Sequence, residues 1–445
     1  MMRKRLIHGT SWAIFSRILA IGLSLFFNMM IARMLTPSEM GSFFLALSLV
    51  SFFSVLGQIG LPQVVVRLVA ESISINMFGR AKQAIYKSLI ISTCSGSCVA
   101  MVFYFGLGGW ISSVVLHSNT LYLIVGLISF SILINSIQGV ITETYRGFHD
   151  IKAASLISSV LPQVLIVGIL AVLWLIHKHV TLSQVFILTI ISSIVVLFTS
   201  LFLLRKNFSE LGTPGKSSYF ELLSIGLPLC AIQITVFIAT QADLWIVGSF
   251  LSEQDVAIYG STQKLLLLLT MTHSLMIAVA QSSVSELFIK GEKRKLEIMI
   301  QTLTIVACFP SFLILSGYLF FGEDILTFVF GVFYKVAFVP LLILAIGQFL
   351  SMLMGPADML LVMTGFQKKL MPLIIVGSIL RILLAILLTL SHGLLGLSFA
   401  WALGAVIQSY LIKEMCVRNL DVKPNISFST IKSFYNKYLT YEFIK

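Results

Sequence analysis

The chain has 445 residues, of which 58% are hydrophobic and only 11% are charged, and its mean hydropathy is +1.01. This composition is typical of a polytopic membrane protein and excludes a string of large soluble domains. The net charge of +12 is explained by membrane topology, because the cations gather in segments on one side of the membrane. We therefore expect no nucleic-acid partner.

The first apolar stretch, near residues 9–31, follows a basic start and contains Arg17 about eight residues from its beginning. Because Arg17 interrupts the run and no small-residue cleavage site follows, we predict a retained membrane span rather than a signal peptide. An ionisable side chain within a span is a functional candidate by default. We therefore expect Arg17 to line a wet cationic cavity, with headgroup contact or an acidic partner on a neighbouring helix as the structural alternative.

The polar residues of this first span share one face. Thr10, Arg17, Ser24 and Asn28 are spaced by seven, seven and four residues, which places them on one side of a helix whose other sides are apolar. Asn28 is therefore a second candidate for the same polar surface. One side of the first helix is expected to be polar and cationic within the membrane.

Apolar stretches predict about 12 membrane spans in all. In chain order they lie near residues 9–31, 41–61, 84–106, 119–142, 153–176, 182–204, 222–249, 257–284, 297–320, 337–362, 371–391 and 395–415. Of the 30 Lys and Arg residues, 24 fall in segments that share one side of the membrane, three fall on the other side and three lie within spans. The excess of cations faces the cytoplasm, so we predict that both termini are cytoplasmic.

A weak internal repeat relates the turns after the first and seventh spans. Residues 35–43 read LTPSEMGSF and residues 251–259 read LSEQDVAIY, with Leu, Thr or Ser, Glu or Asp, Gly or Ala, and Phe or Tyr at equivalent positions. Six crossings return a chain to its starting side, so we predict an all-α polytopic membrane protein of two six-helix halves related by a pseudo-twofold axis along the membrane normal. The predicted parts are an N-terminal half, a cytoplasmic linker, a C-terminal half and a basic amphipathic cytoplasmic tail, at residues 1–206, 207–219, 220–416 and 417–445.

Charged residues also lie within the later spans. Asp243 and Lys264 are expected at equal depth on adjacent antiparallel helices, where they form either a structural ion pair or a proton or cation site. Arg381 lies near the middle of the eleventh span, within reach of Asp358 at the end of the tenth. That arrangement predicts either a structural pair or an anion contact in a cavity.

No acid or histidine cluster accompanies a sizeable loop, as a membrane glycosyltransferase or polymerase would require. The five cysteines lie in or at the ends of apolar segments without metal-ligand spacing. We therefore expect a transporter rather than an enzyme, with no catalytic residue, no metal and no organic cofactor. H⁺ or Na⁺ is the candidate coupling ion.

Residues 32–71, which begin ARMLTPSEM and end VVVRLVAE, resemble the polysaccharide transporter family, together with the matching turn at residues 251–259. These are the Wzx-type O-antigen or oligosaccharide flippases of the MOP superfamily, which also contains MATE drug exporters and the lipid II flippase MurJ. The resemblance implies translocation of an undecaprenyl-diphosphate-linked oligosaccharide repeat unit across a bacterial cytoplasmic (inner) membrane, by alternating access through a cationic cavity.

The resemblance also implies which residues contact the substrate. Arg17, Arg381 and Lys264 would face the diphosphate. Side-chain amides would contact sugars or instead join helices; they are Asn28, Gln58, Asn135, Gln138, Gln163, Gln233 and Gln348. Membrane lipids and a polysaccharide polymerase are the implied partners. An ion-coupled exporter of cationic drugs, which would use Asp243, and a lipid II flippase remain the alternative functions.

Overall fold

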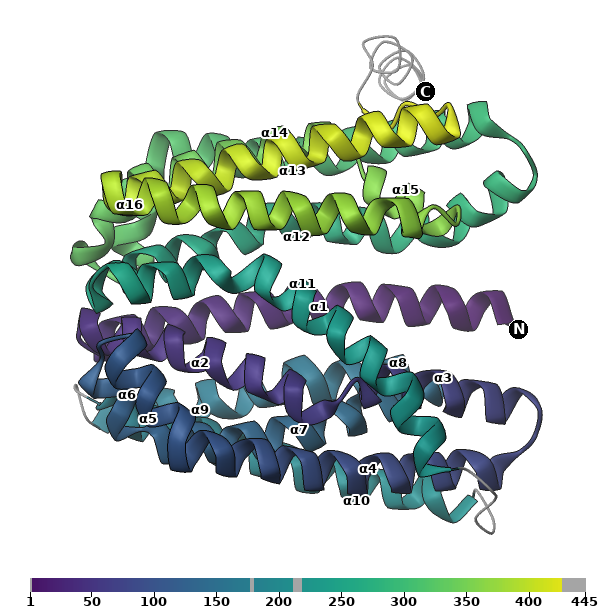
Figure 1. Ribbon diagram of the computed structural model, residues 1–445, viewed down its shortest axis with the longest axis horizontal. Coiled ribbons are helices and arrows are strands. Elements are labelled where there is room, and N and C mark those ends of the chain that lie inside the picture. Colours follow the sequence, from purple (N-terminus) through teal and green to yellow (C-terminus); the bar gives the residue numbers. More distant parts are fainter. Residues whose placement is uncertain (1, 177–179, 211–217, 426–445) are drawn as a thin grey trace. The chain divides into compact units, whose positions relative to one another are not determined.

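A computed structural model of the chain describes residues 2–176, 180–210 and 218–425. The described part is mostly helical and holds no strand. Its α-helices are α1 Met2–Met34, α2 Pro37–Gln58, α3 Leu61–Ser74, α4 Phe78–Val102, α5 Gly108–Trp110, α6 Asn119–Leu123, α7 Val125–Gly147, α8 Ile151–Ser155, α9 Leu161–Ile176, α10 Leu182–Glu210, α11 Tyr219–Phe250, α12 Glu253–Ile289, α13 Lys293–Phe330, α14 Phe338–Leu353, α15 Ala357–Met363 and α16 Gln367–Leu420 (Figure 1). Most of the predicted linker and the segment from residue 426 onward lie outside the described residues.

Ten helical stretches of the described chain are long and apolar enough to cross a membrane. One of them, α16, contains two predicted spans, because Gly393 breaks it with φ 58° and ψ −137°. The predicted span at residues 257–284 corresponds to α12, which is also a continuous helix. The predicted class of an all-α polytopic membrane protein is confirmed, since every predicted span falls on one helix or on consecutive helical segments.

The chain divides into two compact units, an N-terminal unit of Met1–Ala257 and a C-terminal unit of Ile258–Lys445. In the N-terminal unit, α7 packs against α2, α3, α4 and α10, and α11 packs against α2 and α3. In the C-terminal unit, α14 packs against α13 and α16, and α15 also packs against α16. The two predicted six-helix halves, residues 1–206 and 220–416, are defined by the sequence repeat and not by these compact units. Their boundaries stay a prediction.

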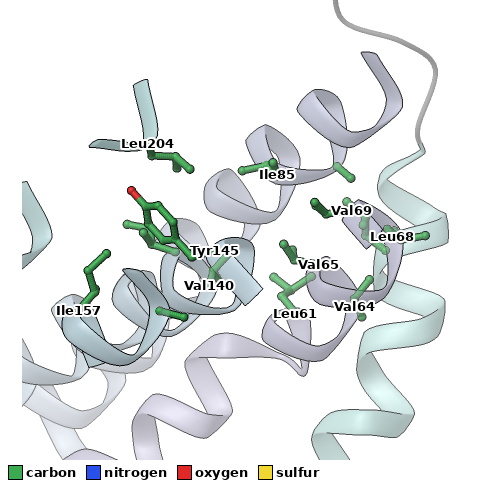
Figure 2. Packing of buried hydrophobic residues seen from close by; sticks show 14 of the residues in the cluster. Leu61, Val64, Val65, Leu68, Val69, Ile85, Val140, Tyr145, Ile157 and Leu204 are labelled. Carbon is green, nitrogen blue, oxygen red and sulfur yellow. The ribbon is translucent and has the colours of Figure 1, made fainter. Parts of the chain in front are cut away.

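Helix α3 supplies much of the packed core of the N-terminal unit. Its buried residues Leu61, Val64, Val65, Leu68 and Val69 follow the i, i+3, i+4, i+7, i+8 spacing of one helix face. Figure 2 shows these residues in one cluster with Ile85 of α4, Val140 and Tyr145 of α7 and Leu204 of α10. Close van der Waals packing of this kind holds helices together where lipid replaces water.

Tyr145 of α7 lies in the same core and is 2% exposed. Its hydroxyl donates a 2.7 Å hydrogen bond to the backbone carbonyl oxygen of Ser200 on α10. The polar tip of an otherwise apolar side chain is thereby satisfied within the bundle.

The two turns that show the sequence repeat adopt the same local structure. Thr36 caps α2 by accepting from the Glu39 amide at 3.3 Å, and Glu39 accepts from the Thr36 amide at 3.0 Å. Ser252 and Asp255 form the equivalent pair of bonds at the start of α12, at 3.2 and 3.1 Å. Each turn is therefore a capping box, which explains why hydroxyl and carboxylate residues recur at this spacing.

These paired turns, residues 35–43 and 251–257, also contact each other within the N-terminal unit. The Glu253 carboxylate accepts a 2.9 Å hydrogen bond from the Ser42 hydroxyl and further hydrogen bonds from Ser38 and Ser118. Gly41 lies so close to the Glu253 carbonyl that a side chain there would collide with it. The start of α12 is thus fixed to α2 and α6 by one carboxylate and three hydroxyls.

Candidate functional site

A polar cavity of about 680 Å³ lies in the described part of the N-terminal unit. It is lined by residues of α2, α3, α7 and α11, together with Ser158. Five side-chain amides contribute to its wall, namely Gln58, Gln63, Asn135, Gln138 and Gln233. Four of the seven amides considered as sugar contacts are therefore brought to one place, and we call it the amide cavity.

Gln58 reaches this cavity because α2 ends there. Ile59 and Gly60 take left-handed backbone angles, with φ 49° and 69°, and turn the chain into α3. The Gln58 Nε2 atom donates a 3.2 Å hydrogen bond to the backbone carbonyl of Asn135 on α7. Gly139 leaves room for this amide, since a Cβ atom at that position would collide with Nε2.

The amide cavity is balanced in charge. Its charged lining residues are Glu143 and Arg146, which lie one turn apart on α7. Their Oε1 and Nη1 atoms form a salt bridge of 2.5 Å. The cavity therefore presents amides and hydroxyls together with a neutralised ion pair, a surface that suits an uncharged polar ligand better than a free ion.

A second cavity, of about 180 Å³, lies within the C-terminal unit. Its polar wall combines His273, Gln348, Ser351, Asp358, Arg381, Gln408 and Ser409. We call it the arginine cavity. The structure thus places Arg381 and Asp358 at the same cavity, as their positions in the sequence led us to expect, while the role of each stays a prediction.

The Arg381 side chain is held by the other arm of α16. Gly393 separates the arm that carries Arg381 from the arm that carries Trp401 and Gly404. The guanidinium carbon lies 4.3 Å from the centre of the Trp401 ring, which is a cation–π stack. A Cβ atom at Gly404 would lie 2.7 Å from both Cγ and Cδ of Arg381, so the glycine provides the space for the arginine stem.

The remaining predicted site residues lie elsewhere. Arg17 is exposed on α1, a helix that contacts α2, α8 and α9. Asn28 is 2% exposed, and its Nδ2 atom donates to the Ser24 carbonyl of the same helix at 2.6 Å. Asp243 is 1% exposed in the N-terminal unit, and Lys264 is half-buried in the C-terminal unit. Substrate or ion binding by these four residues stays a prediction.

Several residues of the two cavities were not predicted. Gln63 and Gln408 are side-chain amides within apolar stretches of sequence. The same criterion that selected the other amides therefore applies to them. Trp401 and Gly404 could not have been found, because their contact with Arg381 depends on the break of α16 at Gly393. Among the described residues, no group of three or more His, Cys, Asp and Glu side chains could hold a metal ion.

Solved structures with the same fold are membrane transporters. One is a multidrug resistance MATE family transporter of the MOP superfamily in an inward-facing conformation, with a TM-score of 0.71 and 15% identity over 92% of this chain and 95% of that chain. Another is the MATE multidrug transporter DinF-BH, with a TM-score of 0.67 and 17% identity over 94% and 95% of the two chains. A third is a MOP superfamily transporter from Pyrococcus furiosus, with a TM-score of 0.62 and 14% identity over 94% of this chain and 96% of that chain.

The apolar helices of the described residues are those of a multi-pass membrane protein, and their fold is shared with these solved transporters. Residues 6–288 match the family of polysaccharide biosynthesis proteins, and the chain belongs to that family. The resemblance to a polysaccharide family stated from the sequence is confirmed, and the fold is similar to that of solved MOP superfamily transporters. No curated protein sequence matches the chain.

Proposed function

We propose that the protein is a flippase that moves an undecaprenyl-diphosphate-linked oligosaccharide repeat unit from the cytoplasmic to the periplasmic leaflet. Membership of the polysaccharide biosynthesis family and a transporter fold support this class of function. The observation that carries the proposal is the Arg381 guanidinium, stacked on Trp401 at a polar cavity within membrane-spanning helices. A charged side chain within a membrane-spanning helix is energetically costly, so its presence there indicates a functional site.

A diphosphate suits the arginine cavity chemically. The planar guanidinium offers paired donors that match two phosphate oxygens, and such charge-assisted bonds are strong where water is scarce. Gln348, Gln408 and Ser351 line the same cavity and offer further donors. The prenyl chain requires no protein cavity, since it can stay in the surrounding lipid.

The transport cycle we propose is alternating access. The substrate enters from the cytoplasmic side of a bacterial inner membrane, with both termini cytoplasmic, and a polysaccharide polymerase takes the product on the other side. Arg17 and Lys264 are proposed as further contacts for the diphosphate and Asn28 for the sugar. H⁺ or Na⁺ is the proposed coupling ion, with Asp243 and Asp358 as the candidate acids; no other cofactor is proposed.

The test is to delete the gene in its host and to restore it with the wild-type gene, Arg381→Ala or Arg17→Ala at matched protein levels. Deletion should remove surface polysaccharide and leave undecaprenyl-diphosphate-linked repeat units on the cytoplasmic side, and neither variant should reverse this. Wild-type polysaccharide in both variants would contradict the cationic cavity. Unchanged polysaccharide on deletion, with altered sensitivity to cationic drugs, would favour an exporter, and arrested peptidoglycan synthesis would favour a lipid II flippase.

A further inference from the structure

We infer that the amide cavity of the N-terminal unit binds the saccharide part of the substrate and selects repeat units by their uncharged polar groups. The inference rests on the proposed function and adds a site to it. It separates two tasks, recognition of the sugar by amides of the N-terminal unit and recognition of the diphosphate by Arg381 of the C-terminal unit.

The lining of the cavity matches the chemistry of a sugar. Each side-chain amide offers both donors and an acceptor, and a sugar hydroxyl or acetamido group also both donates and accepts. Gln58, Gln63, Asn135, Gln138 and Gln233 gather five such groups around one space, beside the hydroxyls of Ser51, Ser54, Thr142 and Ser158. An apolar drug would leave many of these groups without partners, which is unfavourable in a low-dielectric environment.

The size and charge of the cavity agree with this ligand class. Its volume of about 680 Å³ lies within the range of about 300–1,000 Å³ found for pockets that hold small organic ligands. The salt bridge between Glu143 and Arg146 balances the charge of its wall. The amide cavity, whose acid and base are bonded to each other, is therefore suited to the neutral, hydroxyl-rich end of the substrate. The arginine cavity also holds Asp358, but it offers the Arg381 guanidinium, stacked on Trp401, to the anionic end.

One hydrogen bond orients the Gln58 amide at the wall of the cavity. Its Nε2 atom is committed to the Asn135 carbonyl at 3.2 Å, which orients the amide so that its Oε1 atom has a defined direction. The missing side chain at Gly139 provides the space for this orientation. A preorganised acceptor of this kind favours selectivity, because a sugar without the matching hydroxyl leaves the amide oxygen unsatisfied.

The experiment measures the affinity of the purified full-length protein for two probes. One is undecaprenyl diphosphate, and the other is the repeat unit on undecaprenyl diphosphate, extracted from the deletion strain. The wild-type protein should prefer the saccharide-bearing lipid. Gln58→Ala and Gln138→Ala should each reduce that preference about 2- to 10-fold, as expected for the loss of a neutral hydrogen bond, with the affinity for undecaprenyl diphosphate unchanged.

The controls separate recognition from misfolding. Gln254→Ala removes an exposed amide of the same unit outside the cavity and should leave both affinities unchanged. Gly139→Ala keeps every amide but displaces Gln58, and it should reduce the same preference. An undiminished preference in the Gln58→Ala, Gln138→Ala double variant would overturn the inference, as would an equal loss of affinity for both probes. A wild-type protein that binds neither probe would instead overturn the proposed function.

Discussion

The guanidinium carbon of Arg381 lies 4.3 Å from the centre of the Trp401 ring, although the two residues sit on opposite arms of one kinked helix. The stack orients the guanidinium plane, and Gly404 leaves room for the stem. The position of the strongest candidate for phosphate contact is therefore set by the second arm of α16, the arm that follows Gly393.

Replacing Trp401 should weaken transport without preventing insertion. A cation–π contact contributes about 0.5–2 kcal/mol, so Trp401→Leu should reduce the rate of repeat-unit export about 2- to 30-fold, and Trp401→Phe should reduce it less. The measurement is surface polysaccharide at matched protein level. Trp174→Leu, which changes an exposed tryptophan of α9, is the control. Equal effects of Trp401→Leu and Trp174→Leu would contradict a specific role for the stack.

Gly404→Ala should act on the same arginine from the other side. The new methyl group would lie 2.7 Å from Cγ and Cδ of Arg381, so the flexible stem must shift and carry the guanidinium away from its place. We expect reduced export with a loss of about 1–3 kcal/mol in the free energy of unfolding from overpacking, offset by about 1 kcal/mol because alanine favours the helix over glycine. Gly317→Ala is the matched control, since nothing lies within 4 Å of a Cβ atom there. Full export by Gly404→Ala would show that the site tolerates the displacement.

Glu253 should be important for stability, because three hydroxyls depend on its carboxylate. Glu253→Ala removes the acceptor of Ser38, Ser42 and Ser118, of which Ser42 and Ser118 are buried. We expect a loss of about 2 kcal/mol or more, visible as a lower thermal unfolding midpoint of the detergent-solubilised protein, and a smaller loss for Glu253→Gln. An unfolding midpoint for Glu253→Ala equal to that of Gln254→Ala would contradict this.

Tyr145→Phe isolates a single hydrogen bond of the core. The ring stays in place while the buried carbonyl of Ser200 loses its 2.7 Å donor, so the free energy of unfolding should fall by about 1 kcal/mol. Thermal unfolding in detergent measures the change, and Tyr86→Phe on the exposed surface of α4 is the control. A fall in export without any loss of stability would instead indicate a functional role for the hydroxyl.

Much of the fold could be read from hydropathy, because a membrane span must be a long apolar helix. The paired capping boxes could also be read, since hydroxyl and carboxylate residues recur at fixed spacing. Helix α3 was not predicted, although Leu61, Val64, Val65, Leu68 and Val69 carry its amphipathic pattern. A search for spans overlooks a short helix whose other face is polar.

The candidate site was predictable only in its residue types. Amides within apolar spans indicate polar contacts, but the sequence does not say which of them share a cavity. Four of them line the amide cavity, namely Gln58, Asn135, Gln138 and Gln233. Asn28 instead donates a hydrogen bond to a carbonyl of its own helix. Which residues meet depends on helix rotation and on breaks such as Gly393, and tertiary packing sets both.

The turn that delivers Gln58 to the amide cavity has one further consequence. Ile59 is a β-branched residue at φ 49°, a backbone angle that costs such a side chain about 1–3 kcal/mol and that glycine adopts freely. The chain therefore gives up stability at the junction of α2 and α3. Backbone strain at Ile59 is therefore the local cost of the turn that places Gln58 in the wall of the amide cavity.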